Sequence, residues 1–280
     1  MSVEIIEQRL KAYHSKTRLD EINALKEITQ EIALMALSKA DFFKLAEFHG
    51  GTALRILYGM NRFSEDLDFA LLKPDNNFML DNYLNHMEKD FQAYGFHVTT
   101  TDRKDATKTI QKQFLKVDSL GNELSLIYPG ERSERKIKMK FELDTNPPRG
   151  AQTELKYLTF PLAYSVLAKD LPSMFAGKLH ALLCRSYEKG RDWYDFIWFV
   201  SNKTSINYKL LTDAINQQGP WANKAIITNQ KWLVENLAEK IRQLDWENLT
   251  SDVKPLLKPY EQSGLTVWKE EFFLNLINKL

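Results

Sequence analysis

Two glycines, followed by a short helix and by a strand with two aspartates, constrain this chain more than any other segment. Gly50, Gly51 and Thr52 begin the segment, and Asp66 and Asp68 lie near its end. Glycine permits a positive φ and lets a ligand approach the backbone closely. The free N–H groups at the start of the helix that follows favour an anion, and Thr52 adds a hydroxyl donor there. The segment therefore predicts a strand, a phosphate-binding turn, a helix and a second strand.

Asp66 and Asp68 are two positions apart, so on a strand their side chains point to the same face. Two carboxylates aimed at one point repel each other unless a cation lies between them. Oxygen-only ligands favour Mg²⁺, with Mn²⁺ as the alternative. A phosphate-binding turn followed by such a pair predicts metal-dependent phosphoryl or nucleotidyl transfer. Taken separately, the glycines could form a plain turn and the aspartates a solvated face, so the prediction rests on their combination.

Hydrophobic periodicity changes along the chain and predicts the fold class. A helix is predicted at residues 19–38, because apolar residues recur there at helical spacing, and helices are also predicted at 52–58, from composition, and at 77–94. Short strands are predicted at Leu67–Leu72, Phe96–Thr101, Phe114–Val117, Leu124–Ile127 and Ile137–Leu143. After Pro172 the pattern is helical, with helices expected at Ser173–Tyr187, Arg191–Val200, 231–243 and 268–279. We expect an α/β (α+β) fold, with a mixed-sheet domain at residues 1–165 and a helical domain at 166–280.

Composition excludes several classes of protein. Cys184 is the only cysteine, so a disulfide within the chain and a cysteine-based zinc site are both excluded. The formal net charge of +1 is not that of a strongly basic nucleic-acid binder. The N-terminal residues lack the pattern of a signal peptide, and no apolar run is long enough to span a membrane. A cytoplasmic protein with no membrane partner is expected.

Two blocks of sequence resemble a known family. Gly50-Gly51-Thr52-Ala-Leu-Arg, Arg62, Ser64 and Asp66-Leu-Asp68-Phe are similar to the AbiEii/AbiGii nucleotidyltransferase-like toxins, within the DNA polymerase beta nucleotidyltransferase superfamily. The second block contains Lys178 and Arg185, and then Arg191-Asp192-Trp-Tyr-Asp195. It resembles the family's lysine-containing helix followed by Arg-Asp-x-x-Asp. The resemblance covers roughly residues 40–200, and the last 80 residues carry no motif that we can assign.

The resemblance implies roles for individual residues. Lys178 would contact the phosphates of a bound NTP as a point charge, and Asp195 would belong to the active site as a base or as an orienter of Lys178. A purely structural ion pair between Asp195 and Arg191 or Arg185 is the competing interpretation. The implied catalytic residues are Asp66, Asp68, Lys178 and Asp195, and the implied nucleotide- or phosphate-binding residues are Gly50, Gly51, Thr52, Arg62, Ser64, Lys178 and Arg191.

The sequence also gives expectations for Asp144, Arg55 and His49. Superfamily members take a third metal-binding carboxylate from a neighbouring strand, and Asp144 is the candidate here, with Glu142 on the same face as the second choice. Arg55, three positions after Thr52, could pair with the aspartates or with phosphate. For His49 a structural role is favoured.

The resemblance also implies an acceptor and a biological context. The acceptor would be an RNA, such as the 3′ end of a tRNA, and the chain would be a growth-inhibiting toxin with a separately encoded antitoxin. Basic residues of the helical half, Lys224, Lys231, Lys240 and Arg242, are candidates for contacting an RNA backbone. A protein-nucleotidylating enzyme, a kinase-like enzyme and a non-catalytic partner-binding protein on the same fold are the alternatives.

Overall fold

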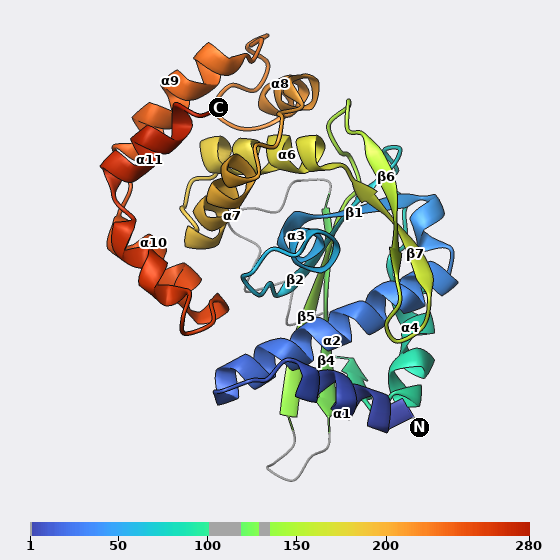
Figure 1. The fold of residues 1–280 in the computed structure, drawn as a ribbon. Helices are drawn as coiled ribbons and strands as arrows, with labels where there is room; N and C mark the ends of the chain where they lie inside the picture. Colours follow the sequence, from blue (N-terminus) through green and yellow to red (C-terminus); the bar gives the residue numbers. More distant parts are fainter. Residues whose placement is uncertain (1, 101–118, 129–134) are drawn as a thin grey trace. The chain divides into compact units, whose positions relative to one another are not determined.

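A computed structural model describes residues 2–100, 119–128 and 135–280 (Figure 1). The chain forms two compact units. Unit 1 comprises Met1–Pro147 and Thr153–Ala168, and unit 2 comprises Pro148–Gln152 and Lys169–Leu280. Within these residues, no helix combines the length and the apolar character needed to cross a membrane.

Unit 1 is built on one mixed sheet. The strands are β1 (Ala46–His49), β2 (Asp66–Leu71), β3 (His97–Thr100), β4 (Ser119–Tyr128), β5 (Arg135–Asp144), β6 (Thr153–Leu158) and β7 (Tyr164–Lys169). In the described part of the chain they form a seven-stranded sheet in the order β3-β4-β5-β2-β1-β7-β6. The β2–β5 and β1–β7 pairs are parallel, whereas the β1–β2, β3–β4 and β4–β5 pairs are antiparallel. The predicted α/β class with a mixed sheet is therefore confirmed.

The alternation of side chains in β5 is the clearest link between the sequence and the core of unit 1. Ile137, Met139, Phe141 and Leu143 are all buried, as their spacing predicts for one face of a strand. The strands predicted at Phe96–Thr101 and Leu124–Ile127 correspond to β3 and to part of β4. The strand predicted at Phe114–Val117, and Thr101 itself, lie outside the described residues.

The helices of unit 1 are α1 (Ser2–Ala12), α2 (Arg18–Lys39), α3 (Gly50–Tyr58) and α4 (Asp81–Ala93), with a 3₁₀ turn η1 at Phe42–Lys44. A capping box fixes the start of α2, because Thr17 accepts from the backbone N–H of Asp20 and Asp20 accepts from that of Thr17. α2 contacts both α4 and β5. Gly59 ends α3 in the left-handed conformation, which glycine adopts without steric cost.

Unit 2 is helical throughout its longer segment. Its helices are α6 (Leu171–Cys184), α7 (Gly190–Ser201), α8 (Tyr208–Gln217), α9 (Gln230–Ile241), α10 (Trp246–Val253) and α11 (Glu270–Ile277), with 3₁₀ turns η2 (Lys254–Leu256) and η3 (Gln262–Val267). Aromatic rings fill its core: Phe175 stacks on Phe199 with ring centroids 4.6 Å apart, and Trp246 stacks on Phe273 at 4.7 Å. α6 contacts α7 and α8, so the helix that carries Lys178 is held from two sides.

Some boundaries and elements differ from the sequence predictions. α6 ends at Cys184, three residues before the predicted end at Tyr187, and Arg185 already has an extended backbone. α1, β6, β7 and α10 were not predicted. The alternation in β6 places Leu155 and Tyr157 on an exposed face. That strand therefore lacks the buried apolar face by which a strand is recognised in a sequence.

Candidate functional site

The turn between β1 and α3 brings the backbone against the second aspartate of β2. β1 pairs antiparallel with β2, and His49 is the register partner of Asp68. Gly50 follows with a φ of +80°, and a Cβ added at this position would collide with the carboxylate of Asp68. Glycine is therefore needed for two reasons, the backbone conformation and the close approach of the Asp68 side chain. The sequence predicted the first reason and missed the second.

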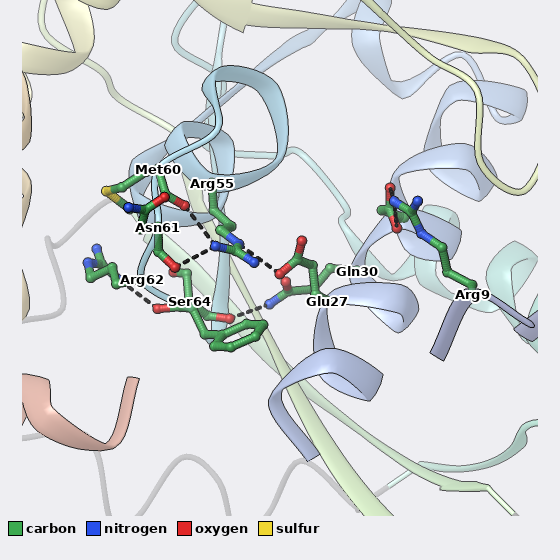
Figure 2. A network of polar contacts seen from close by, with 10 residues as sticks. Arg9, Glu27, Gln30, Arg55, Met60, Asn61, Arg62 and Ser64 are labelled. Atoms are coloured by element: carbon green, nitrogen blue, oxygen red, sulfur yellow. Dashed lines mark hydrogen bonds and ion pairs between the residues drawn. The ribbon is translucent and has the colours of Figure 1, made fainter. Parts of the chain in front are cut away.

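The second glycine makes room for the side chains of the connection between α3 and β2. A Cβ at Gly51 would lie 2.5 Å from Nη2 of Arg62 and 2.9 Å from Oγ of Ser64. Arg62 is almost fully buried and donates from Nη1 to the carbonyl oxygen of Phe63 at 3.0 Å. The carbonyl of Ser64 accepts a hydrogen bond from Nε2 of Gln30 at 3.0 Å (Figure 2). The structure thus brings Gly51, Arg62 and Ser64 together, as the sequence motif suggests.

Thr52 positions the first aspartate of β2. Its side chain is fully buried, and its hydroxyl donates to the backbone carbonyl of Asp66. The hydroxyl proton is therefore used within the protein, and the hydrogen bond ties the first turn of α3 to the start of β2. The predicted contact of Thr52 with phosphate remains a prediction.

Arg55 has a different partner from the two that the sequence suggested. Its Nε donates to Oε2 of Glu27 at 2.8 Å, and its Nη1 donates to the carbonyl oxygens of Met60, at 3.0 Å, and Asn61 (Figure 2). Its guanidinium also lies over the ring of Phe63, 4.5 Å from the centroid. Arg55 therefore joins α3 to α2 and to the connection that leads into β2. The expectation that it pairs with the aspartates or with phosphate is corrected.

The register between β2 and β5 places charged residues beside the aspartate pair. Asp66 is opposite Lys140, and Asp68 is opposite Glu142. Residues in register on neighbouring strands direct their side chains to the same face. Nζ of Lys140 forms an ion pair with Oε1 of Glu142. This face of the sheet therefore presents three carboxylates and one ammonium group over four positions.

Asp144, the predicted third metal ligand, lies one step further along β5. Its register partner is Ala70, and its carboxylate accepts from the backbone N–H of Asn146 at 3.1 Å. Among the described residues, no three His, Cys, Asp or Glu side chains are gathered closely enough to hold a metal ion. Glu142, the second choice, is the register partner of Asp68. The metal role of Asp144 stays a prediction.

The donor set at Asp66 and Asp68 suits Mg²⁺ or Mn²⁺. Mg²⁺ is commonly held by one or two carboxylates, with waters and substrate phosphates as its remaining ligands. Asp66 and Asp68 are two positions apart on β2, so their side chains point to the same face of the sheet. Gly50 lets the backbone approach the carboxylate of Asp68. Such a pair of carboxylates fits an ion that arrives with a nucleotide.

Unit 2 contains a second charged cluster, built on α6 and α7. Nζ of Lys178 lies 2.6 Å from Oδ1 of Asp192 and 2.8 Å from Oδ2 of Asp195. Nη1 of Arg185 forms an ion pair with Oδ2 of Asp192. The Asp195 side chain is fully buried, and that of Lys178 is 13% exposed. One ammonium group therefore bridges two carboxylates that lie one helical turn apart.

The charges of this second cluster stabilise one another. Burial works to raise the pKa of Asp192, but the nearby ammonium of Lys178 and guanidinium of Arg185 hold it far below its usual range. Asp192 is therefore ionised at any physiological pH. The sequence left Lys178 and Arg191 as candidate cations for Asp195, and the structure pairs Asp195 with Lys178. The guanidinium of Arg185, which was also considered for Asp195, pairs with Asp192.

Two glycines flank this cluster with opposite surroundings. Gly177 is exposed, and a Cβ there would meet no atom within 4 Å, so the helix surface next to Lys178 is open. Gly190 is buried, and a Cβ there would collide with the carbonyl of Leu249 in α10. No local pattern in the sequence indicates that Gly190 is needed for the packing of α7 against α10.

The sequence profile of one protein family matches most of this chain. The family is described as the nucleotidyl transferase AbiEii toxin of type IV toxin–antitoxin systems, and the match covers residues 32–272. The chain belongs to the AbiEii nucleotidyltransferase toxin family. It is accordingly a nucleotidyltransferase of a toxin–antitoxin family, and such enzymes use an NTP and a divalent metal ion. The match also extends well beyond residues 40–200, so the C-terminal helices are part of the family's domain.

Solved structures give a weaker likeness. A candidate nucleotidyltransferase from Helicobacter pylori is 16% identical to this AbiEii family member, with a TM-score of 0.47 over 91% of this chain and 95% of that chain. JHP933 from Helicobacter pylori is also 16% identical, with a TM-score of 0.46 over 90% and 94% of the two chains. A comparison with curated proteins gives no significant match.

The remaining residues that the sequence singled out have simple environments. Lys224, Lys231 and Arg242 are exposed, whereas Lys240 forms an ion pair with Glu188 at 2.5 Å and is therefore less available to an RNA backbone. Burial raises the pKa of the Cys184 thiol to about 12, so this cysteine is unreactive at neutral pH, as expected for a residue that packs within the helical unit.

Lys140 is the residue of this site that sequence reasoning missed. The alternation in β5 showed that Lys140, Glu142 and Asp144 share a face, but the register that places Lys140 opposite Asp66 depends on strand pairing between distant segments. No local pattern in the sequence gives that register.

Proposed function

We propose that this AbiEii family member transfers an NMP group from an NTP to a hydroxyl group of RNA, at the 3′ end of a tRNA, with Mg²⁺ as the metal ion. In this proposal the modified RNA halts growth, and a cognate antitoxin counteracts the toxin. The observation that carries the proposal is the contact between Gly50 and the Asp68 carboxylate. It joins the start of a helix to one of two carboxylates on a common face, which is an arrangement for phosphate together with a metal ion.

Asp66 and Asp68 are the residues that would hold the ion, and Mn²⁺ would be the alternative to Mg²⁺. When bound, the divalent ion neutralises negative charge on phosphate oxygens and makes the phosphorus more electrophilic. The hydrogen bond from Thr52 to the Asp66 carbonyl and the absence of a side chain at Gly50 fix the two aspartates relative to α3. The chain's own contribution is thus a rigid pair of ligands beside a helix start.

The start of α3 supplies the other half of the proposed phosphate site. Its first backbone N–H groups have no partner within the helix, and the helix dipole favours an anion at this end. In the reaction, the acceptor oxygen forms a bond to the α-phosphorus, and the bond from that phosphorus to the β-phosphate oxygen breaks, which releases pyrophosphate. The acceptor hydroxyl loses its proton to the surrounding water.

Lys178 and Asp195 are proposed as further residues that the same reaction requires. An ammonium group can neutralise charge on the leaving phosphates as a point charge. Asp195 is fully buried, and its carboxylate lies 2.8 Å from Nζ of Lys178. This ion pair supports the role of an orienter, because Asp195 holds the ammonium group of Lys178 in place. Arg62, Ser64 and Arg191 remain candidates for contacts with the nucleotide.

The proposal is tested by supplying each of the four NTPs, labelled at the α-phosphorus, together with Mg²⁺ and either total tRNA or total protein. Labelling of tRNA that is lost when the tRNA is oxidised with periodate before the reaction, which destroys its terminal 3′ hydroxyl, supports the proposed acceptor. Label on protein would show protein nucleotidylation instead. The matched variants are Asp66→Asn and Asp68→Asn, which keep the size of the side chain and remove its charge. Equal labelling of RNA by wild type and both variants would contradict the proposal.

A further inference from the structure

Lys140 lies among the carboxylates to which the proposed function assigns the metal ion. It is opposite Asp66 in the β2–β5 register, and Glu142, two positions further along β5, is opposite Asp68. All four side chains emerge on one face of the sheet. The two aspartates and the glutamate would carry three negative charges over this short distance. Lys140 is the lysine that this register places directly beside them.

Lys140 contacts one of these carboxylates directly. Nζ of Lys140 forms an ion pair with Oε1 of Glu142, and the side chain of Lys140 is one-third exposed. The positive charge of Lys140 therefore lies beside Glu142, with Asp66 opposite it in the register.

We propose that Lys140 is a built-in counter-cation that competes with the divalent ion for Asp66, Asp68 and Glu142. The inference rests on the proposed role of the two aspartates as metal ligands. Like charges repel, so an ammonium group beside these carboxylates lowers the affinity of the pair for a free ion. Binding of the ion requires the Lys140 side chain to move away, which its partial exposure and long flexible stem allow.

This competition has a consequence for the order of binding. A bare divalent ion gains little from a carboxylate pair that already has a counter-charge. An ion that arrives with a nucleotide brings phosphate oxygens, and these provide both further ligands for the ion and a new partner for the displaced ammonium group. Lys140 thus biases the site towards the metal–nucleotide complex and against the free ion. Lys140 is a positioning residue in this account, because it acts through the carboxylates.

The test measures the affinity for Mn²⁺ alone, by electron paramagnetic resonance of the free ion, without nucleotide or RNA. Lys140→Met is expected to bind Mn²⁺ about five- to tenfold more tightly than wild type, since one repelling charge is removed near a dication. Lys140→Arg keeps the charge and is expected to stay within about twofold of wild type. Lys140→Gln is a polar substitute that gives the same direction as Lys140→Met if the methionine variant folds poorly.

A matched control lies on the same strand. Lys138→Met removes the same charge from the same face of β5. Lys138 lies two positions before Lys140, which is the register partner of Asp66, and so it is further from the two aspartates. Its effect on Mn²⁺ affinity should therefore be smaller than that of Lys140→Met. A general effect of net charge, in contrast, would tighten binding equally in both variants and would overturn the inference.

The outcomes separate this inference from the proposed function. In one outcome, Lys140→Met binds Mn²⁺ no more tightly than wild type, and the double variant with Asp66→Asn and Asp68→Asn does not bind it. The counter-cation role then fails, and the metal role of the aspartates stands. If the double aspartate variant binds Mn²⁺ as wild type does, the aspartates are not the ligands. Both the metal assignment and the counter-cation role then fail.

Discussion

Gly50 and Gly59, at the two ends of α3, have similar backbones but different neighbours. Their φ angles are +80° and +73°, yet a Cβ would collide with Asp68 at Gly50 and would meet no atom within 4 Å at Gly59. Gly59→Ala is therefore expected to lose about 1 kcal/mol of unfolding free energy from backbone strain and to keep its transferase activity. Gly50→Ala is expected to lose about 2–3 kcal/mol and most of its activity, because the Asp68 carboxylate must move.

Denaturant unfolding and the labelled-NTP assay measure these two effects on the same preparations. Equal losses of stability and equal activities in the two variants would mean that the contact between Gly50 and Asp68 has no consequence for the site. The comparison is fair because both substitutions add one methyl group to a glycine with a positive φ.

Another residue-scale prediction concerns Glu31 of α2. Burial raises its pKa from 4.5 to about 7, even though Arg9 donates from Nη2 to its Oε1 at 2.9 Å. Between pH 4.5 and about pH 7, Glu31 keeps its proton in the folded protein and releases it in the unfolded chain. The contribution of Glu31 to stability is therefore fully present below about pH 4.5 and is lost as the pH rises through 7.

The pH dependence of unfolding in wild type and in Glu31→Gln tests this assignment. Wild type should lose more unfolding free energy than the variant between about pH 5 and about pH 8, because glutamine has no proton to release. Parallel stability curves for the two proteins over this range would show that Glu31 titrates normally in the folded state.

Pairs of helices, rather than single residues, determine how unit 2 responds to substitution. α7 packs against α10 through Gly190, where a Cβ would collide with the carbonyl of Leu249, whereas Gly177 of α6 faces open space. Gly190→Ala is expected to lower the unfolding free energy by about 2–4 kcal/mol, because the added methyl group would force the backbone of α7 or α10 to move. Gly177→Ala is expected to raise it by about 0.5–1 kcal/mol through helix propensity. Thermal unfolding measures both, and a destabilised Gly177→Ala variant would contradict the open surface beside Lys178.

The bridge from Lys178 of α6 to Asp192 and Asp195 of α7 gives a second element-scale prediction. Lys178→Met leaves two buried carboxylates without their shared ammonium group, so a loss of about 3–5 kcal/mol is expected. Lys178→Arg keeps the charge and should fold, but its planar fork cannot reproduce a point charge on phosphate, so its kcat should fall. If Lys178→Arg keeps the wild-type kcat, Lys178 has only a structural role in joining the two helices.

At the scale of the whole molecule, the sequence predicts what depends on local patterns. The buried alternation at Ile137–Leu143 and the helical periodicity at residues 19–38 predicted β5 and α2, because each pattern lies within a single element. The β2–β5 register could not be predicted, since it joins segments far apart in the chain, and so Lys140 was missed. The inclusion of Pro148–Gln152 in unit 2 likewise depends on packing that local sequence does not encode.

Nucleotidyl transfer to RNA is tested most directly by comparing NTPs labelled at the α-phosphorus with NTPs labelled at the γ-phosphorus, using tRNA as the acceptor and Mg²⁺ as the ion. Nucleotidyl transfer predicts that the α-label appears on the tRNA, that the γ-label appears only in pyrophosphate, and that Asp66→Asn and Asp68→Asn abolish the α-labelling. Transfer of the γ-label to the tRNA, or α-labelling that survives in both aspartate variants, would contradict the account.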